Sequence, residues 1–225
     1  MESIVYISNA RLSFPHLSEP QKKVNEATGE IRISYNCELI LEPDHRGYVK
    51  FIEVYSKLAF EKWKPNTATV MSMILADRKS RCFGNGDDKI NKKTFLPYDG
   101  YKGNTYITVG RDTPPQMILD NGKPVEPGNT MLYQQVAQRL YGGCRVNAAI
   151  KPWLQDNRHG RGVRTDLVAI QFFKDDTAFG EGSVDASHMF GAVAGHNEDA
   201  DEFSAQEPPF NNMNSADAYR AAKGY

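Results

Sequence analysis

Apolar and polar residues alternate over several segments of this chain, and the alternation predicts a mainly β protein. The cleanest case covers residues 31–41, where every second position from Ile31 to Leu41 is apolar or aromatic, the period expected of a half-buried strand. The same period over residues 3–14 predicts a first strand that ends at Pro15, because proline cannot donate to a strand ladder. Residues 16–30 are then expected to form a polar loop that leads into the next antiparallel strand.

Shorter patterns predict two more strands and three helices. Strands are expected over residues 104–111 and, at a sheet edge, over 117–119. Apolar residues spaced by three and four predict a helix over about 44–64 with Asp44 as its N-cap, and further helices over about 67–76 and 130–140. We expect the first helix to cover one end of the sheet, with its lysines on the solvated surface.

The longest strand-like stretch, residues 142–174, predicts a two-stranded ribbon with two chemically different faces. Alternate side chains of a strand point to opposite sides. One face of the first arm carries Cys144, Val146, Ala148, Ile150 and Leu154, and the other carries Arg145, Asn147, Lys151 and Trp153. The turn over residues 156–162 adds Arg158, His159 and Arg161, and the return arm over 163–173 is rich in β-branched and aromatic residues. One face of the ribbon is therefore basic and carries an indole.

A basic strand face with an exposed indole suits an anion whose flat groups can stack, and single-stranded nucleic acid is the commonest such ligand. The alternative is structural: Trp153, which follows Pro152, would cap the end of the sheet, and the basic residues would be ordinary solvated surface.

Residues 78–104 combine basic and aromatic side chains without a clear period. Phe95, Tyr98 and Tyr101 lie among Lys92, Lys93 and Lys102, and glycine and proline bound the segment. A long loop of this composition on a compact domain is more often functional than idle. The alternative here is an aromatic mini-core in which some of the rings hold the loop against the body.

Charge divides the chain into a basic body and an acidic C-terminal segment. Residues 181–225 hold eight acids and two bases, a net charge of −6, so that residues 1–180 carry +5 of the total of −1. Apolar residues are sparse in the last part of the chain, and too little apolar surface remains there to offset the cost of ordering. We therefore predict a folded domain over residues 1–178 and a flexible acidic tail over 179–225.

The sequence lacks the motifs of the common enzyme classes. Phosphate-binding loops, zinc-protease, hydrolase and calcium-loop motifs are all missing, and the adjacent acids Asp87 and Asp88 are weak support for a metal nuclease. The three cysteines and five histidines have no metal-ligand spacing, and the odd, scattered cysteines suit a reducing cytoplasm. No apolar run approaches the roughly 18 residues of a membrane span, and none suggests a signal peptide. We expect no catalysis, no cofactor and no metal.

Several motifs resemble the OB-fold single-stranded-DNA-binding proteins of tailed bacteriophages. The similarity covers most of residues 1–180. It is strongest at Leu-Tyr-Gly-Gly-Cys-Arg-Val-Asn-Ala (140–148), at Gly-Arg-Gly-Val (160–163) and at Leu-Val-Ala-Ile-Gln-Phe (167–172), with Phe179-Gly180 closing the body. The acidic group at 198–203 and Glu-Pro-Pro-Phe at 207–210 resemble that class's acidic tail and aromatic tip, although here the chain continues to Tyr225.

The resemblance implies a mainly β fold: an OB-fold-like antiparallel Greek-key barrel with a helical insertion and a disordered acidic C-terminal tail. It implies a protein that coats single-stranded DNA without sequence specificity during phage replication or recombination, in the host cytoplasm. The expected stacking residues are Trp153, Tyr106, Phe95, Tyr98 and Tyr101. The expected phosphate ligands are Lys92, Lys93, Lys102, Arg111, Arg145, Lys151, Arg158, Arg161 and Arg164. The expected partner-binding residues of the tail are Asp199, Asp201, Glu202, Phe203 and Phe210.

Two other functions stay open at this point. The aromatic loop could contact another protein, as in an interaction module or a recombination mediator, and an OB-fold could equally bind RNA. Site size, cooperativity and oligomeric state have no signal in the sequence.

Overall fold

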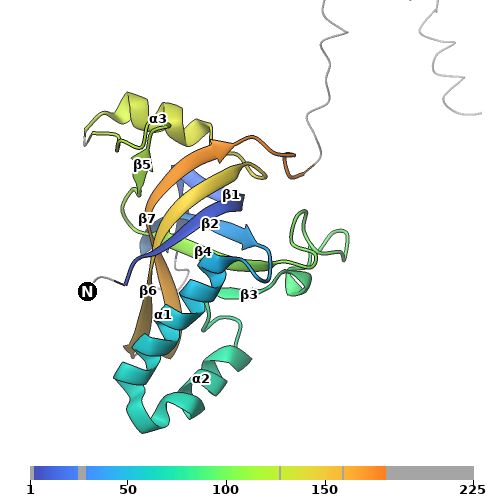
Figure 1. The fold of residues 1–225 in the computed structure, drawn as a ribbon, viewed down its shortest axis with the longest axis vertical. Helices are drawn as coiled ribbons and strands as arrows, with labels where there is room; N and C mark the ends of the chain where they lie inside the picture. The colour runs from blue at the N-terminus through green and yellow to red at the C-terminus, as the bar shows by residue number, and fades with distance from the viewer. Residues whose placement is uncertain (1–2, 25–28, 127, 159, 181–225) are drawn as a thin grey trace, which may run out of the picture. The chain divides into compact units, whose positions relative to one another are not determined.

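A computed structural model describes residues 3–24, 29–126, 128–158 and 160–180 of the 225-residue chain. The elements in chain order are β1 (Val5–Val24), β2 (Ile31–Leu41), α1 (Arg46–Trp63), α2 (Thr67–Ala76), β3 (Phe83–Asn85), β4 (Thr105–Arg111), β5 (Gln116–Ile118), α3 (Thr130–Gln138), β6 (Arg145–Asn157) and β7 (Gly160–Lys174) (Figure 1). The predicted helices and the short strands therefore lie close to where the sequence placed them.

The strands form one curved sheet in the order β3-β4-β2-β1-β6-β7-β5, and every pairing is antiparallel except that of β5 with β7. The sheet curls so that β7 and β4 come close together, and residues 80–82 lie between them and bond to both strands. Val163 of β7 donates its N–H to the carbonyl of Ser80 at 2.9 Å, and Thr108 of β4 donates to the carbonyl of Cys82 at 2.6 Å. The result is a barrel with α1 and α2 inserted between β2 and β3, which confirms the predicted mainly β fold with a helical insertion.

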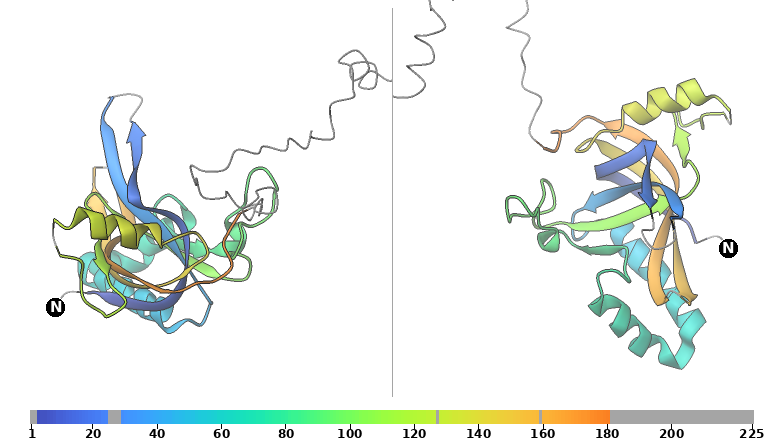
Figure 2. Two further views of the ribbon diagram at one scale, coloured as in Figure 1. Left: turned by 90° about the horizontal axis from the view of Figure 1, so that it is seen from above. Right: turned by 180° about the vertical axis from the view of Figure 1, so that it is seen from behind.

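The first strand is longer than the sequence suggested, and the predicted loop over residues 16–30 is wrong. β1 continues past Pro15 and Pro20 to Val24, which lies opposite Ile31 of β2. Two register shifts, between Ser13 and His16 and between His16 and Gln21, accommodate the missing proline N–H donors. Beyond the barrel the two strands form a hairpin arm, here called the β1–β2 arm, which projects from the sheet (Figure 2).

The core lies between the inner face of the barrel and α1. Fully buried side chains from β1, β2, β4, β6 and β7 meet Phe51 of α1, while Tyr55, Ala59 and Trp63 extend the same apolar stripe. The helix begins one residue later than predicted, because His45 rather than Asp44 is the N-cap. The His45 Nδ1 accepts from the N–H of Gly47 at 3.0 Å, and its Nε2 lies 2.8 Å from the carbonyl of Ser8, which ties the cap to β1.

The last described residues are fastened to the body. Phe179 donates its N–H to the carbonyl of Gly142 at 2.8 Å, and the Arg11 guanidinium lies 4.3 Å from the centre of the Phe179 ring. Gly180 donates to Oδ2 of Asp99 at 3.0 Å. These two residues therefore belong to the folded body rather than to the predicted tail. The acidic residues and phenylalanines assigned to partner binding, Asp199 to Phe210, lie outside the described residues.

Within the described ranges, no helix is long and apolar enough to cross a membrane.

Candidate nucleic-acid interface

The tip of the β6–β7 hairpin presents the two-faced surface that the sequence predicted. We call residues 151–157 and 160–166 the ribbon tip. Its inner face buries Pro152, Val163 and Thr165. On the outer face Trp153 lies directly opposite Arg164, and Lys151 lies directly opposite Asp166. An indole and two basic side chains thus share one outer strand face, as a stacking and phosphate-binding surface requires.

Trp153 is exposed, and a hydrogen bond fixes the orientation of its ring. The side chain keeps 40% of its surface accessible. Its indole Nε1–H donates to Oδ1 of Asp166 at 2.7 Å, and Arg164 next to it donates through Nε to Oε1 of Gln155 at 3.0 Å. The hydrogen bond at its polar edge therefore fixes the orientation of the exposed ring. Ligand binding then costs less side-chain conformational entropy. Asp166 was not among the predicted site residues, although a carboxylate opposite Lys151 in the hairpin register was a signal for it.

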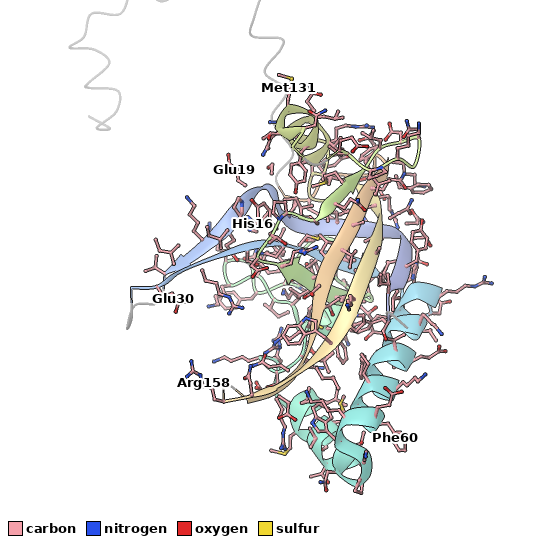
Figure 3. All side chains as sticks on the ribbon, turned by 90° about the vertical axis from the view of Figure 1, so that its left-hand side faces the viewer. His16, Glu19, Glu30, Phe60, Met131 and Arg158 are labelled. Carbon is pink, nitrogen blue, oxygen red and sulfur yellow. The ribbon has the colours of Figure 1, made fainter. Side chains whose placement is uncertain are left out.

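The inner side of the ribbon tip rests on the end of α1. Trp63 donates its indole N–H to Oδ2 of Asp156 at 2.8 Å, and Arg161 donates through Nε to Oδ1 of the same carboxylate at 3.1 Å. These hydrogen bonds, the one from Trp63 first, lower the pKa of Asp156 below its ordinary value. Arg161 thus helps to hold the hairpin, and Arg158 lies at its very end (Figure 3).

Two of the predicted stacking residues, Tyr101 and Tyr106, are buried, and that prediction is wrong for both. Tyr101 has no exposed surface and donates its hydroxyl to Oε2 of Glu38. Tyr106 is 8% exposed, and the ammonium of Lys89 lies 4.7 Å from its ring centre. Burial first, and then the Glu38 charge, raises the pKa of Tyr101 far above its ordinary range. The alternative of an aromatic mini-core that holds the loop is thus confirmed for Tyr101, which packs against Tyr106 of β4.

Glu38 is the polar centre of this buried cluster. Besides Tyr101 it accepts hydrogen bonds from the Lys89 ammonium and, at 3.3 Å, from the hydroxyl of Thr108. The carboxylate is thereby paired and hydrogen-bonded, as a charge removed from water must be. The loop over residues 89–104 is therefore held against the outer face of β2 and β4.

The remaining loop residues stay accessible but lie apart from the ribbon tip. Phe95 is 79% exposed, and Lys92, Lys93 and Lys102 are exposed around it. Tyr98 is half-buried and packs edge-on against Phe14 at 5.2 Å. The loop and the ribbon tip project from different sides of the barrel (Figures 1 and 2). The predicted residues of the loop and those of the ribbon tip therefore form two separate groups, not one surface.

Two of the predicted phosphate ligands, Arg145 and Arg111, lie in other settings. Arg145 donates through Nε to Oδ2 of Asp176 at 2.7 Å and through Nη1 to the carbonyl of Asn9 at 3.1 Å, so that it stabilises the body and is removed from the candidate surface. Arg111 lies at the end of β4 opposite Tyr35 and lines a separate cavity. Among the described residues, His, Cys, Asp and Glu form no cluster suited to a metal ion.

Comparison with known proteins shows which family the chain resembles. The family model of the Enterobacter phage Enc34 ssDNA-binding protein matches residues 3–204. The structure of the bacteriophage Enc34 single-stranded DNA-binding protein in complex with ssDNA is 25% identical, with a TM-score of 0.58, over 79% of this chain and 90% of that one. A second structure of that protein is 26% identical, with a TM-score of 0.57, over 83% and 89%.

A sequence relative comes from another phage. The protein p50 of Acyrthosiphon pisum secondary endosymbiont phage 1 is 28% identical over 188 residues, which are 83% of this chain and 91% of p50. The matches to Enc34 and to p50 thus span nearly the whole length of both relatives. The chain belongs to the Enterobacter phage Enc34 ssDNA-binding protein family.

Proposed function

We propose that this protein binds single-stranded DNA without sequence specificity and that the ribbon tip is its principal contact surface. The observation that carries the proposal is the exposed Trp153, which is hydrogen-bonded to Asp166 and shares its strand face with the basic residues Lys151 and Arg164. Base–aromatic stacking contributes about 1–3 kcal/mol per base and tolerates every base, while basic side chains bind phosphates without reading sequence. Membership in the Enc34 ssDNA-binding protein family supports the same function.

The β1–β2 arm and the ribbon tip suggest how single-stranded DNA would be held. The β1–β2 arm and the ribbon tip extend from the same side of the barrel, with Glu30 near the end of one and Arg158 at the end of the other (Figure 3). Exposed Arg32 lies on β2 within the arm, so that both arms carry basic residues. We infer that the strand passes between them and is coated during phage replication or recombination in the host cytoplasm.

We propose that the acidic tail competes with DNA for these basic side chains and recruits partner proteins. The last described residue, Gly180, is bound to Asp99 in the loop that carries Lys102. The segment of net charge −6 that follows is thus tethered to a body of net charge +5. A tethered segment has a high effective concentration at nearby cations, which supports competition with DNA.

A binding titration tests the proposal directly. The full chain is mixed with a labelled oligo-dT at increasing salt and followed by fluorescence anisotropy, with duplex DNA and RNA as competitors. We expect tight, strongly salt-dependent binding that duplex DNA displaces poorly. Absence of binding would instead favour a protein-interaction module, and stronger competition by RNA would favour an RNA-binding protein.

A further inference from the structure

A cavity of about 570 Å³ opens at one end of the barrel. It lies between the middle of β2, the end of β4, the segment that contains β5, and the start of α3. Its volume is within the roughly 300–1,000 Å³ range of ligand sites in proteins. Neither the ribbon tip nor the loop over residues 89–104 contributes to its walls. The cavity is thus a feature that the proposed function has not used.

Two tyrosines supply aromatic walls. Tyr35 of β2 and Tyr133 of α3 both line the cavity, and both are half-buried. Tyr133 donates its hydroxyl to the carbonyl of Leu17 at 3.3 Å, which fixes its ring. Burial, and secondarily the nearby Tyr35 phenol, raises the pKa of Tyr133 to about 12, in keeping with two phenols close together. Flat rings held in this way are suited to contact with another flat group.

A cation lies beside these rings. Arg111 is directly opposite Tyr35 in the β2–β4 register and lines the same cavity. Among the residues that the structure describes, Arg111 forms no ion pair. A guanidinium recognises phosphate through two parallel N–H groups. The walls also contain Glu126, Gln116 and Gln134, whose oxygens can accept hydrogen bonds from the edge of a nucleobase.

Strand β7 leads from the ribbon tip to the cavity. Arg164 and Asp166 lie on the outer face of β7, because Val163, Thr165 and Leu167, which alternate with them, are buried. Val168 forms part of the cavity wall. At about 3.3 Å per residue, Val168 lies roughly 13 Å along the strand from Arg164, the neighbour of Trp153. Single-stranded DNA with a base stacked on Trp153 would therefore reach the cavity by following β7.

We propose that this cavity takes one nucleotide of the bound single strand, with its base against Tyr35 and Tyr133 and its phosphate on Arg111. The inference rests on the proposed function, because it places a second base site on the same strand. The aromatic walls alone would also suit an apolar side chain of a protein. The unpaired guanidinium and the hydrogen-bond acceptors around the rings favour a nucleotide.

Three variants of the full chain test the proposal by anisotropy with labelled oligo-dT. Tyr35→Ala removes a wall, Arg111→Ala removes the cation, and Thr130→Trp fills the cavity from its exposed rim. We expect Tyr35→Ala and Thr130→Trp to weaken binding about five- to 150-fold, the range for one lost base contact. Arg111→Ala should lower the slope of log K against log[salt] by roughly 0.7. Arg46→Ala, at an exposed arginine that starts α1 far from these walls, is the matched control and should bind like the wild type.

The outcomes separate the two proposals. If the wild type does not bind oligo-dT, the proposed function fails. If the wild type binds and Thr130→Trp and Arg111→Ala bind equally well, the cavity proposal alone is overturned. Because Tyr35→Ala could disturb folding, the site is also located by photocrosslinking the wild type to an oligonucleotide that contains 5-bromodeoxyuridine. Crosslinks in peptides with Tyr35 or Tyr133 support the cavity, and crosslinks confined to the ribbon tip contradict it.

Discussion

The indole nitrogen of Trp153 lies 2.7 Å from Oδ1 of Asp166, across the strand pair that forms the ribbon tip. This hydrogen bond satisfies the only polar atom of the indole and leaves the ring 40% exposed. An exposed tryptophan on a sheet surface is costly to leave in water. Its fixed orientation beside Arg164 therefore suits a site that a flat ligand covers.

Replacing Trp153 tests this site. Trp153→Ala should weaken binding to single-stranded DNA by about 1–3 kcal/mol, because a stacking platform is lost, while the salt dependence stays the same. Trp153→Phe, which keeps an aromatic ring but loses the N–H, should recover part of the affinity. Anisotropy titrations at several salt concentrations measure both effects. Unaltered binding by the alanine variant, or its failure to fold, would show that Trp153 serves the core.

Lys151 should behave differently from Trp153. Lys151→Ala is expected to lower the slope of log K against log[salt] by roughly 0.7, since about that many counterions are released per phosphate neutralised on a single strand. Lys57→Ala is the matched control, because Lys57 lies on the solvated side of α1 and pairs with Glu61. Equal slopes for the two lysine variants would remove Lys151 from the interface.

Tyr101 should matter for stability and not for DNA binding. Tyr101→Phe leaves the ring in place but removes a hydroxyl that donates to Glu38. The partly buried carboxylate then lacks one donor, and we expect the free energy of unfolding to fall by about 1–3 kcal/mol. Urea denaturation measures this change, and the affinity for oligo-dT should stay at the wild-type value. A large loss of affinity in a folded variant would restore Tyr101 as a stacking residue.

Asp176 should stabilise the protein only above acidic pH. Hydrogen bonds from Arg145 and from the N–H of Thr177, together with the nearby Arg11 charge, hold the pKa of Asp176 below its ordinary value of 3.8. A carboxylate with a lowered pKa contributes stability above that value and loses it as the pH falls through the folded-state pKa. Asp176→Asn should therefore lower the Tm at pH 7 by at most about 2–4 °C, as for an exposed pair. The difference should shrink as the pH falls below about 3.8 and vanish once the pH has passed the folded-state pKa, whereas a difference that stays constant through this range would contradict the ion-pair role.

Removal of the acidic tail should tighten DNA binding. A chain that ends at Gly180 lacks the net −6 of residues 181–225 and keeps a body of net +5. The gain should be largest at low salt and shrink as salt rises, because the Debye length is already about 10 Å at 0.1 M. The truncated protein should also hold duplex DNA more strongly than the intact protein. Superimposable isotherms of the two proteins across salt concentrations would rule out competition by the tail.

Features that depend on neighbouring positions were determined by the sequence alone. The two faces of β6 follow from an alternation within one strand, and the stripe of α1 follows from helical spacing, so both were predicted near their observed places. The outward position of Trp153 is a direct consequence of this period. The basic body and the acidic segment from residue 181 onward follow likewise from counting charges.

Features that depend on which segments meet in space were decided only by the tertiary structure. Tyr101 lies in a loop whose composition resembles that of a ligand-binding segment. Its ring is nevertheless buried, because its hydroxyl donates a hydrogen bond to Glu38, 63 residues earlier. Arg145 lies on the outer face of β6, as the alternation predicted, but Asp176 at the end of the body forms an ion pair with it. Strand β1 crosses two prolines because β2 pairs with it from Arg11 to Val24. A local period sets which way a side chain points, whereas its exposure depends on the distant segment that covers it.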